Sequence, residues 1–242
     1  MSAMPKAAMV LAAGLGTRMK GLIADKPKAL VEVLGKPLID YAIEKFALAG
    51  IKKLVVNVHH QANALEAHLK KRRGVEIVIS DERAKLLETG GGIKKALPLL
   101  GPSPFFAHNS DSLWVEGYAS TLERMAARFD EREMDALLLL APFNRAVGYE
   151  GAGDFDMAAD GTLKRRAEQR VAAFAFTGLQ LLQPRAFAGA PEGAFSMNAV
   201  WDRAAEAGKL YGIRLDGTWL HVGTPEGLRE AEAALRELQR GE

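Results

Sequence analysis

The chain has 242 residues, 48 % of them hydrophobic, which is enough for a large core in one α/β domain. A formal net charge of +2 with scattered basic residues argues against a nucleic-acid partner, and the absence of a long apolar run and of a signal-peptide pattern argues against a membrane partner. We therefore expect a cytoplasmic protein that acts on small molecules as a monomer or small homo-oligomer, and the lack of cysteine gives no reason to expect secretion.

Strand-like and helix-like runs alternate through the first half of the chain, which predicts βαβ units and a parallel sheet. The expected elements are, in chain order, a strand over Ala7–Ala13, a helix over Pro37–Ala49, a strand over Lys53–Val58, a helix over Ala62–Lys71 and a strand over Val75–Ser80. The sheet is expected to continue with strands over Pro104–His108 and Asp135–Ala141, separated by a helix over about Tyr118–Phe129.

The second half of the chain has a looser pattern. Between Val147 and Phe176, glycines, short alternating runs and a basic turn predict antiparallel hairpins that cover one end of the sheet. Amphipathic helices are expected over Ser196–Ala207 and from about Pro225 to the end. No linker composition and no internal repeat divides the chain.

The segment Leu11–Lys28 follows the first strand and contains a glycine-rich turn. Gly14 and Gly16 allow a sharp turn that brings backbone N–H groups against an anion. Fixed positive charge comes from Arg18, Lys26 and Lys28. A dinucleotide fingerprint requires glycine in place of Met19, and a Walker A loop requires Gly-Lys-Ser/Thr at 19–21, so neither motif fits. These residues alone leave a phosphate cradle and a plain structural turn both open.

Three further segments lie at strand ends. Asp111 follows a strand, at the sheet edge where ligands bind in open α/β folds, and could bind a divalent cation there. The structural alternative is that it caps a turn or helix. Glu88–Gly92 contains three consecutive glycines and is interpreted as a loop, either one that approaches a nucleobase or a purely structural one. His59 and His60 are more typical of hydrogen-bonded loop residues than of ligands.

The segment 219–226 near the end predicts a short strand that passes through a Gly-Thr cap and a first-turn proline into the last helix. His221 lies on this strand. Because a strand residue has two faces to choose from, the sequence leaves open whether His221 faces a site.

Five ordered motifs resemble those of the sugar-1-phosphate nucleotidyltransferases. They are LAAGLGTRM (11–19), DKPKAL (25–30), LLETGGGI (86–93), NSDS (109–112) and WLHVGTPEGL (219–228). Together they span nearly the whole chain, which is far more specific than one glycine pair. Within the family, the chain is most similar to the short bacterial N-acetylmuramate-1-phosphate uridylyltransferases of cell-wall recycling. Mannose-1-phosphate guanylyltransferases, and a non-catalytic regulatory protein that binds nucleotide-sugars, are the alternatives.

The resemblance implies a single Rossmann-like α/β domain over residues 1–242, with a mostly parallel central sheet flanked by helices and small antiparallel hairpins over the sugar side. A nucleotide-binding half would cover about 1–115 and a sugar-binding half about 116–242, with no β-helix acyltransferase domain. The implied partners are a nucleoside triphosphate, UTP or GTP, and a sugar-1-phosphate, whose oxygen attacks the α-phosphorus as pyrophosphate leaves. Such chemistry depends mostly on positioning and charge neutralisation.

The resemblance also implies roles for individual residues. Arg18 and Lys28 would be catalytic, Lys28 near the α-phosphate and Arg18 at the β- and γ-phosphates, and Asp111 would hold Mg²⁺. The implied nucleotide-binding residues are Ala12, Ala13, Gly14, Gly16, Thr17, Arg18, Glu88, Thr89, Gly90 and Gly91. The implied sugar-binding residues are Asn109, Gly153, Glu168, Arg170 and Asn198. Asn57, His59 and His60 correspond more weakly to residues near the site.

Two departures from the family pattern affect loops and the sugar phosphate. Gly21 and Ala29 stand where the family has prolines, which changes loop stiffness but loses no charge. The family's Glu-Lys-Pro segment, whose lysine binds the sugar phosphate, is replaced by residues 168–170, Glu-Gln-Arg. Possible replacements for that lysine are Arg170, Lys164 and Arg165, and the candidates to bind the carboxylate of an acidic sugar are Arg145, Arg165 and Arg170.

The third departure is His221, which replaces the aspartate that serves as the second Mg²⁺ ligand in the family. Neutral imidazole is a poor ligand for a hard cation. Three alternatives follow, in order of preference. Asp111, triphosphate oxygens and water suffice for Mg²⁺; or a softer ion such as Mn²⁺ or Co²⁺ is preferred; or His221 hydrogen-bonds a phosphate instead.

Overall fold

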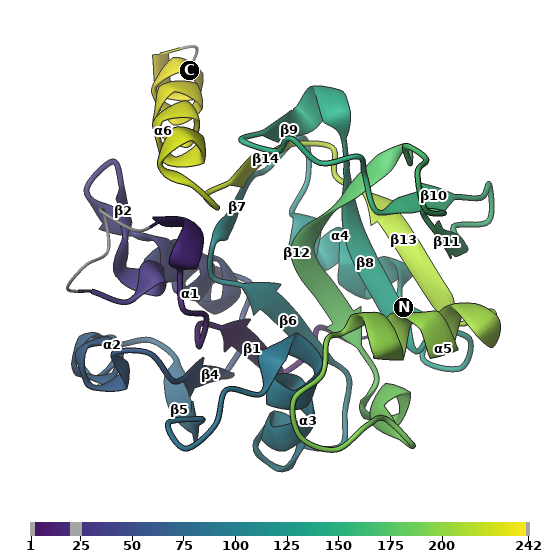
Figure 1. Cartoon of the computed structure of the whole chain (residues 1–242), viewed down its shortest axis with the longest axis horizontal. Coiled ribbons are helices and arrows are strands. Elements are labelled where there is room, and N and C mark those ends of the chain that lie inside the picture. Colours follow the sequence, from purple (N-terminus) through teal and green to yellow (C-terminus); the bar gives the residue numbers. More distant parts are fainter. Residues whose placement is uncertain (1–2, 20–25, 241–242) are drawn as a thin grey trace.

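The computed structural model describes residues 3–19 and 26–240. Gly21 and Asp25, which belong to the sequence motifs above, lie outside the described residues. Within the described part of the chain, nine strands form one central sheet, with helices on both of its faces (Figure 1). This sheet runs through both halves of the chain, and the division into a nucleotide half and a sugar half near residue 115 stays a prediction.

The strands of the first half pair in parallel, as predicted. They are β1 (Ala7–Leu11), β4 (Lys53–Val58), β5 (Glu76–Asp81) and β6 (Phe105–Asn109). β1 lies in the middle, between β4 and β6, and β5 follows β4 at the edge. Residues 8–10 of β1 are fully buried, because helices cover both faces of the sheet. The carboxyl ends of β1, β4 and β6 therefore meet at one edge.

The other half of the sheet contains two strands that the sequence did not predict. β12 (Phe174–Leu182) lies antiparallel to β6 and to β8 (Ala136–Pro142), and β13 (Leu210–Arg214) lies parallel to β8. The predicted hairpin is present at the edge as β10 (Phe155–Met157) and β11 (Leu163–Arg165). The assignment of everything up to Phe176 to covering hairpins was wrong, because Phe174 already begins the long central strand β12.

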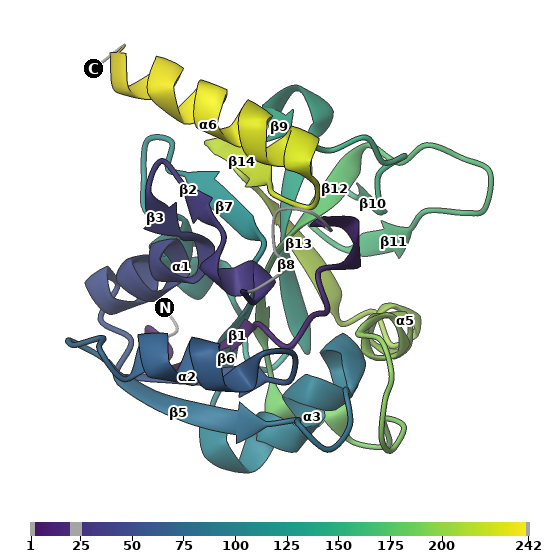
Figure 2. The same ribbon diagram turned by 60° about the vertical axis from the view of Figure 1, so that its left-hand side comes forward.

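Helices cover the two faces of the sheet with two separate hydrophobic clusters (Figure 2). The helices are α1 (Leu38–Leu48), α2 (Ala62–Leu69), α3 (Glu88–Leu100), α4 (Thr121–Arg128), α5 (Asn198–Glu206) and α6 (Pro225–Arg240). Side chains of α1, α2 and α4 pack on one face, and side chains of α3 and α5 pack on the other. Each predicted helix is confirmed, with ends within a few residues. None of the helices described is both long and apolar enough to cross a membrane.

A second, three-stranded sheet joins the last helix to the body. It consists of β7 (Ser112–Val115), β14 (Thr218–His221) and β9 (Ala146–Val147), and a hairpin of β2 (Glu32–Val33) and β3 (Lys36–Pro37) lies nearby. Thr224 caps α6 as predicted, since its Oγ1 accepts a hydrogen bond from Gly227 N at 3.1 Å. In β14, His221 pairs with Ser112, so the strand that carries His221 lies beside the turn that carries Asp111.

Candidate active site

One cavity of about 460 Å³ opens at the carboxyl ends of β1, β4 and β6, and we call it the edge cavity. The size is typical of small-ligand sites, which usually lie at this edge of an open α/β sheet. Eight of the ten residues implied to bind nucleotide line it, namely Ala12, Ala13, Gly14, Gly16, Thr17, Arg18, Glu88 and Thr89. Lys28, Asn109 and Asp111 line it as well. Four of the five motifs therefore meet at the edge cavity, and residues 219–228 do not line it.

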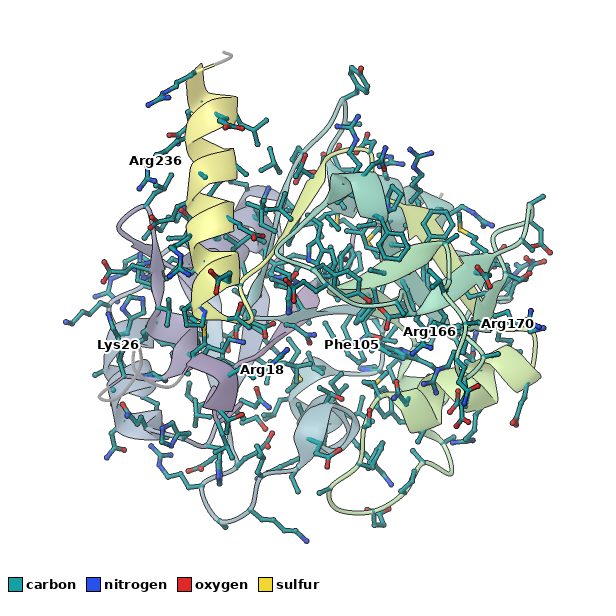
Figure 3. The ribbon with its side chains drawn as sticks, turned by 45° about the horizontal axis from the view of Figure 1, so that its top comes forward. Arg18, Lys26, Phe105, Arg166, Arg170 and Arg236 are labelled. Carbon is teal, nitrogen blue, oxygen red and sulfur yellow. The ribbon has the colours of Figure 1, made fainter. Side chains whose placement is uncertain are left out.

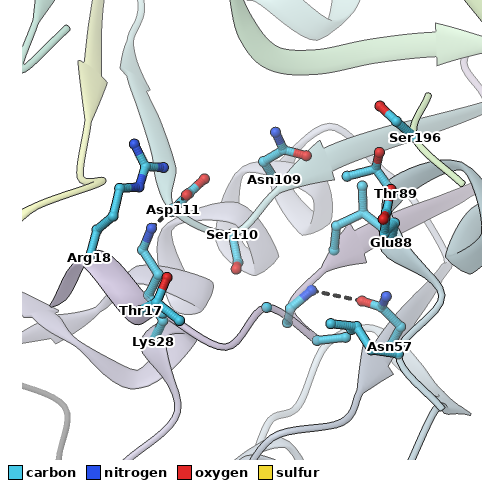
Figure 4. A pocket seen from close by; sticks show the side chains of 16 residues that line it. Thr17, Arg18, Lys28, Asn57, Glu88, Thr89, Asn109, Ser110, Asp111 and Ser196 are labelled. Atoms are coloured by element: carbon cyan, nitrogen blue, oxygen red, sulfur yellow. Dashed lines mark hydrogen bonds and ion pairs between the residues drawn. The ribbon is translucent and has the colours of Figure 1, made fainter. Parts of the chain in front are cut away.

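The edge cavity has two chemically different ends (Figure 4). Arg18, Lys28 and Asp111 lie together at one end, and Glu88 and Thr89 lie at the other. The first end therefore concentrates positive charge, while the second offers a carboxylate and a hydroxyl that can hydrogen-bond a neutral polar group.

At the charged end, Lys28 Nζ lies 2.7 Å from Asp111 Oδ2, and the two side chains are only 12 % and 24 % exposed. Burial alone would raise the pKa of the Asp111 carboxyl, but the Lys28 ammonium and, less strongly, His221 hold that pKa below its ordinary value. Asp111 is therefore ionised at neutral pH. The expectation that it might cap a helix is wrong, because β7 begins at the next residue.

The glycine-rich turn after β1 forms the floor of the charged end. Gly16 has a φ of +62°, and its carbonyl accepts a hydrogen bond from Met19 N at 2.8 Å, which closes the turn. A Cβ at Gly14 would meet nothing within 4 Å, although Gly14 lines the edge cavity. Among residues 3–19 and 26–240, no atom therefore occupies the space that a side chain at Gly14 would fill.

The interpretation of Glu88–Gly92 as a loop was wrong, because these residues form the first turns of α3. The N–H groups of Gly90 and Gly91 both donate to the carbonyl of Phe195, at 2.8 and 3.0 Å. A Cβ at Gly90 would lie 2.4 Å from the Phe195 ring, and one at Gly91 would lie 2.2 Å from the Gly193 carbonyl. These two glycines therefore accommodate the 193–195 segment, and neither lines the edge cavity.

His221 lies half-buried next to the charged end and does not line the edge cavity. Its ring packs against Tyr149 and Trp219, with centroid separations of 6.4 and 5.5 Å. Burial, opposed in part by the Asp111 carboxylate, lowers the pKa of His221, and the charge of Lys28 lowers it further. Within residues 3–19 and 26–240, no group of three or more His, Cys, Asp or Glu side chains is placed to hold a metal ion.

Of the residues implied to bind sugar, Asn109 lines the edge cavity and four do not. Gly153 takes a φ of +77° and its carbonyl accepts a hydrogen bond from Arg166 Nε at 2.9 Å. Glu168 and Arg170 lie on an exposed loop, where the Arg170 carbonyl accepts from Arg166 Nη1 at 3.0 Å. Asn198 is the exposed first residue of α5. Figure 3 shows Arg166 and Arg170 near β11, well away from Arg18.

The other basic candidates also lie elsewhere. Arg165 Nη1 contacts both carboxylate oxygens of Asp202 on α5, at 2.7 and 2.8 Å. Arg145 lines a separate cavity together with Tyr118 and Arg214. His59 is a hydrogen-bonded loop residue, as expected, since its Nδ1 lies 2.7 Å from the Glu82 carbonyl.

Four residues that line the edge cavity were not predicted, namely Leu11, Leu86, Ser110 and Ser196. Leu11, Leu86 and Ser110 lie inside motifs that the sequence had already singled out. Ser196 carries no local signal, because it reaches the edge cavity only through the contact between Phe195 and the first turn of α3.

A doubly covered α/β sheet with a cationic cavity at its carboxyl edge is typical of enzymes that bind phosphorylated ligands. The chain matches the family described as nucleotidyl transferase over residues 7–237, and it belongs to that family. It is 45 % identical over 241 residues to N-acetylmuramate alpha-1-phosphate uridylyltransferase of Caulobacter vibrioides, covering 98 % of this chain and 100 % of that one. The family resemblance seen in the motifs is confirmed.

Two further comparisons agree. The chain is 32 % identical over 229 residues to the protein of the same name from Neisseria meningitidis serogroup B, covering 93 % of this chain and 96 % of the relative. The solved structure of UDP-glucose pyrophosphorylase complexed with UDP-glucose has a TM-score of 0.80 at 17 % identity, covering 96 % of this chain and 99 % of that one. The similarity to UDP-glucose pyrophosphorylase shows a shared fold.

Proposed function

We propose that the chain joins UTP and N-acetylmuramate-1-phosphate to give a UDP-sugar and pyrophosphate. The observation that carries this proposal is the edge cavity, with Arg18 and Lys28 at one end and Glu88 and Thr89 at the other. A nucleoside triphosphate has the same division between a highly charged and a neutral polar end. The names of the two bacterial relatives support the choice of uracil and of the sugar. N-acetylmuramate is a peptidoglycan sugar, so the proposal places the enzyme in cell-wall recycling in the cytoplasm.

The proposed orientation places the nucleotide along the edge cavity. The β- and γ-phosphates lie against the turn at Gly16 and Thr17, with the Arg18 guanidinium beside them. The base lies at the first turn of α3, near Glu88 and Thr89. Ala12, Ala13 and Gly14 form the floor under the ribose. Gly90 and Gly91 support the base only indirectly, since their N–H groups are taken by Phe195.

The proposed reaction needs no covalent enzyme intermediate. A phosphate oxygen of the sugar-1-phosphate forms a bond to the α-phosphorus, and the bond from that phosphorus to the bridging α–β oxygen breaks, so pyrophosphate leaves with the electron pair. Lys28 stabilises the charge that develops at the α-phosphate, and Arg18 stabilises the charge on the departing pyrophosphate. The fixed positions of these two cations supply most of the catalysis that the chain itself provides.

On the sugar side, Asn109 is the implied contact that lines the edge cavity. Gly153, Glu168, Arg170 and Asn198 remain predicted sugar contacts. Arg170 and Lys164 are the exposed candidates to replace the family lysine, since Arg165 is held by Asp202.

The donor set fits a divalent cation. Asp111 presents an ionised carboxylate to the edge cavity, and among the described residues Lys28 donates to Oδ2 while no donor contacts Oδ1. Carboxylate, phosphate and water oxygens are the ligands that Mg²⁺ prefers. Asp111 would therefore hold Mg²⁺, which would neutralise charge on the triphosphate. Mn²⁺ and Co²⁺ are the alternatives if His221 takes part.

Replacing His221 by alanine is expected to change the Mg²⁺ concentration for half-maximal turnover by less than about threefold, because a neutral imidazole is a weak ligand for this ion. Replacing Asp111 by asparagine is expected to raise it by at least about tenfold, since a carboxylate is lost. Initial rates over a range of Mg²⁺, Mn²⁺ or Co²⁺ concentrations provide the measurement, for wild type, His221→Ala, His221→Asp and Asp111→Asn. A His221→Ala enzyme that loses activity with Mn²⁺ or Co²⁺ would identify His221 as a ligand.

The substrates are tested by a matrix of UTP, GTP, CTP, ATP and dTTP against N-acetylmuramate-1-phosphate, glucose-1-phosphate and mannose-1-phosphate, with pyrophosphate release as the signal. We expect the highest kcat/KM for UTP with N-acetylmuramate-1-phosphate. Highest activity for GTP with mannose-1-phosphate would identify a guanylyltransferase instead. Tight binding of UDP-sugars without turnover of any pair would identify a regulatory protein.

A further inference from the structure

A chain of three hydrogen bonds, two of them buried and the third partly buried, runs along the edge cavity, and Ala12 and Asn57 in this chain line the cavity. Ala12 N donates to Asn57 Oδ1 at 2.7 Å, Asn57 Nδ2 donates to Glu82 Oε1 at 2.8 Å, and Leu87 N donates to Glu82 Oε2 at 3.0 Å. The bond from Ala12 to Asn57 is drawn in Figure 4. Asn57 is 2 % exposed and Glu82 is 1 % exposed. Glu82 does not line the edge cavity, so it acts through its neighbours.

These three bonds connect the two walls of the edge cavity. Ala12 begins the glycine-rich turn directly after β1, and Leu87 directly precedes the first turn of α3. Asn57 lies on β4 between the two, opposite Leu11 in the parallel pairing. One asparagine and one carboxylate therefore link one wall to the other by side-chain hydrogen bonds.

The direction of every bond in this chain is fixed. Backbone N–H groups can only donate, so Asn57 Oδ1 must accept from Ala12 and Glu82 Oε2 must accept from Leu87. The amide of Asn57 then presents its Nδ2 donor to Glu82, whose Oε1 must accept as well. Only a carboxylate supplies two acceptors here. A glutamine at position 82 has only one acceptor oxygen, so its NH₂ group would face a second donor, either Asn57 Nδ2 or Leu87 N.

The third glycine of the 88–92 segment makes room for this arrangement. A Cβ at Gly92 would lie 2.8 Å from Glu82 Oε1 and 3.0 Å from Asn57 Nδ2. The absence of a side chain at Gly92 thus leaves room for Glu82 and Asn57, whereas its absence at Gly90 and Gly91 leaves room for the 193–195 segment. Glu88, which follows Leu87, takes a φ of +59° and lines the edge cavity, so its position depends on where Leu87 N is held.

We propose that Glu82 is a positioning residue, which through Asn57 holds the glycine-rich turn and the first turn of α3 at the separation that one nucleotide requires. This inference rests on the proposed function, since it assigns the phosphates to one wall and the base to the other. Glu82 contributes by the direction of its hydrogen bonds and not by contact with the nucleotide.

Glu82→Gln is the direct test. We expect this variant to weaken UTP binding, measured by calorimetry without divalent cation, by at least about tenfold, and to raise KM for UTP more than it lowers kcat. The matched control is Glu76→Gln, which makes the same change at an exposed position of β5 and should leave affinity within about twofold of wild type.

A compensating change separates positioning from a general loss of stability. In the double variant Glu82→Gln/Asn57→Asp, the introduced carboxylate can accept from both Ala12 N and the NH₂ group of the introduced glutamine. The carbonyl oxygen of that glutamine accepts from Leu87 N, so every donor again meets an acceptor. We expect UTP affinity to return to within about threefold of wild type. Asn57→Asp alone places two carboxylates in contact and should weaken binding as Glu82→Gln does.

Backbone amide hydrogen exchange gives a readout that needs no nucleotide. The N–H groups of Ala12 and Leu87 should exchange slowly in wild type, faster in Glu82→Gln and slowly again in the double variant. Wild-type UTP affinity in Glu82→Gln, or a double variant no better than Glu82→Gln, would overturn the proposal. Restored exchange in a protein that binds no nucleotide in any form would instead refute the proposed function and, with it, the positioning role.

Discussion

Replacing Lys28 by alanine is expected to lower kcat/KM for UTP by at least about a hundredfold, which corresponds to about 2.7 kcal/mol of lost transition-state stabilisation. The Lys28 side chain is 12 % exposed, and its ammonium nitrogen lies 2.7 Å from Asp111 Oδ2 in the edge cavity. Without it, the phosphates of the nucleotide would face the Asp111 carboxylate, and Arg18 would be the remaining cation among the described residues that line that end. Steady-state release of pyrophosphate measures the effect.

The matched control for Lys28→Ala is Lys52→Ala, which removes an exposed lysine that does not line the edge cavity. It should leave kcat/KM within about twofold of wild type, because solvent screens a distant surface charge. Lys28→Arg is expected to recover part of the lost activity, since it keeps the charge but not the reach or geometry of the ammonium. A Lys28→Ala enzyme that retains more than about a tenth of wild-type kcat/KM would remove Lys28 from the catalytic role.

The first half of the fold could be predicted because its signals are local. The strand over Lys53–Val58 has the bounds expected from the sequence, and α1 differs from its expected helix by one residue at each end. An apolar run between turn residues, or apolar residues at helical spacing, carries that information within about a dozen positions. The same holds for part of the charged end of the edge cavity, since the glycine-rich turn and Lys28 lie within the single segment Leu11–Lys28.

β12 was missed because its pattern is interrupted in the middle. Gly178 takes a φ of +88°, and the pairing with β8 shifts register between Phe176 and Gln180. A glycine inside an apolar run is typical of a loop boundary as well as of a bulge, and the sequence alone does not separate the two. The glycine itself has a spatial cause, because a Cβ at Gly178 would lie 3.1 Å from Asn109 Cβ, at the end of β6.

The glycines of the 88–92 segment show a different limit. Glycine was expected there because something comes close to the backbone, and this expectation was right. The segment in contact with Gly90 is Phe195, more than a hundred positions later in the chain, and the groups in contact with Gly92 are Asn57 and Glu82. A glycine is needed both where another part of the protein comes close to the backbone and where a base does, because either would collide with a Cβ. The sequence therefore could not tell which of the two lies against each glycine.

Lowering the pH from 7 to 4 is expected to reduce the free energy of unfolding by about 3 kcal/mol through His108 alone. His108 is fully buried on β6, and its Nε2 lies 2.9 Å from the Ser112 carbonyl, to which it donates. Burial lowers the pKa of His108 from 6.5 to about 4. Between these two values the imidazole is protonated in the unfolded chain and neutral in the folded one. The unfolded state therefore binds more protons, and stability falls as the pH falls through this window.

His108→Gln separates this contribution from that of the other acidic groups. Glutamine keeps an N–H donor for the Ser112 carbonyl but does not titrate, so the variant should lose less stability between pH 7 and 4 than wild type, by about 3 kcal/mol. Urea unfolding at the two pH values gives the four free energies required, and His60→Gln, at a partly exposed loop position, controls for loss of a histidine as such. The comparison uses only the change in the free energy of unfolding between pH 7 and pH 4, because any cost of the substitution that is the same at both pH values cancels. If wild type and His108→Gln lose the same free energy of unfolding between pH 7 and pH 4, the pKa of the buried imidazole is the same in the folded and unfolded states.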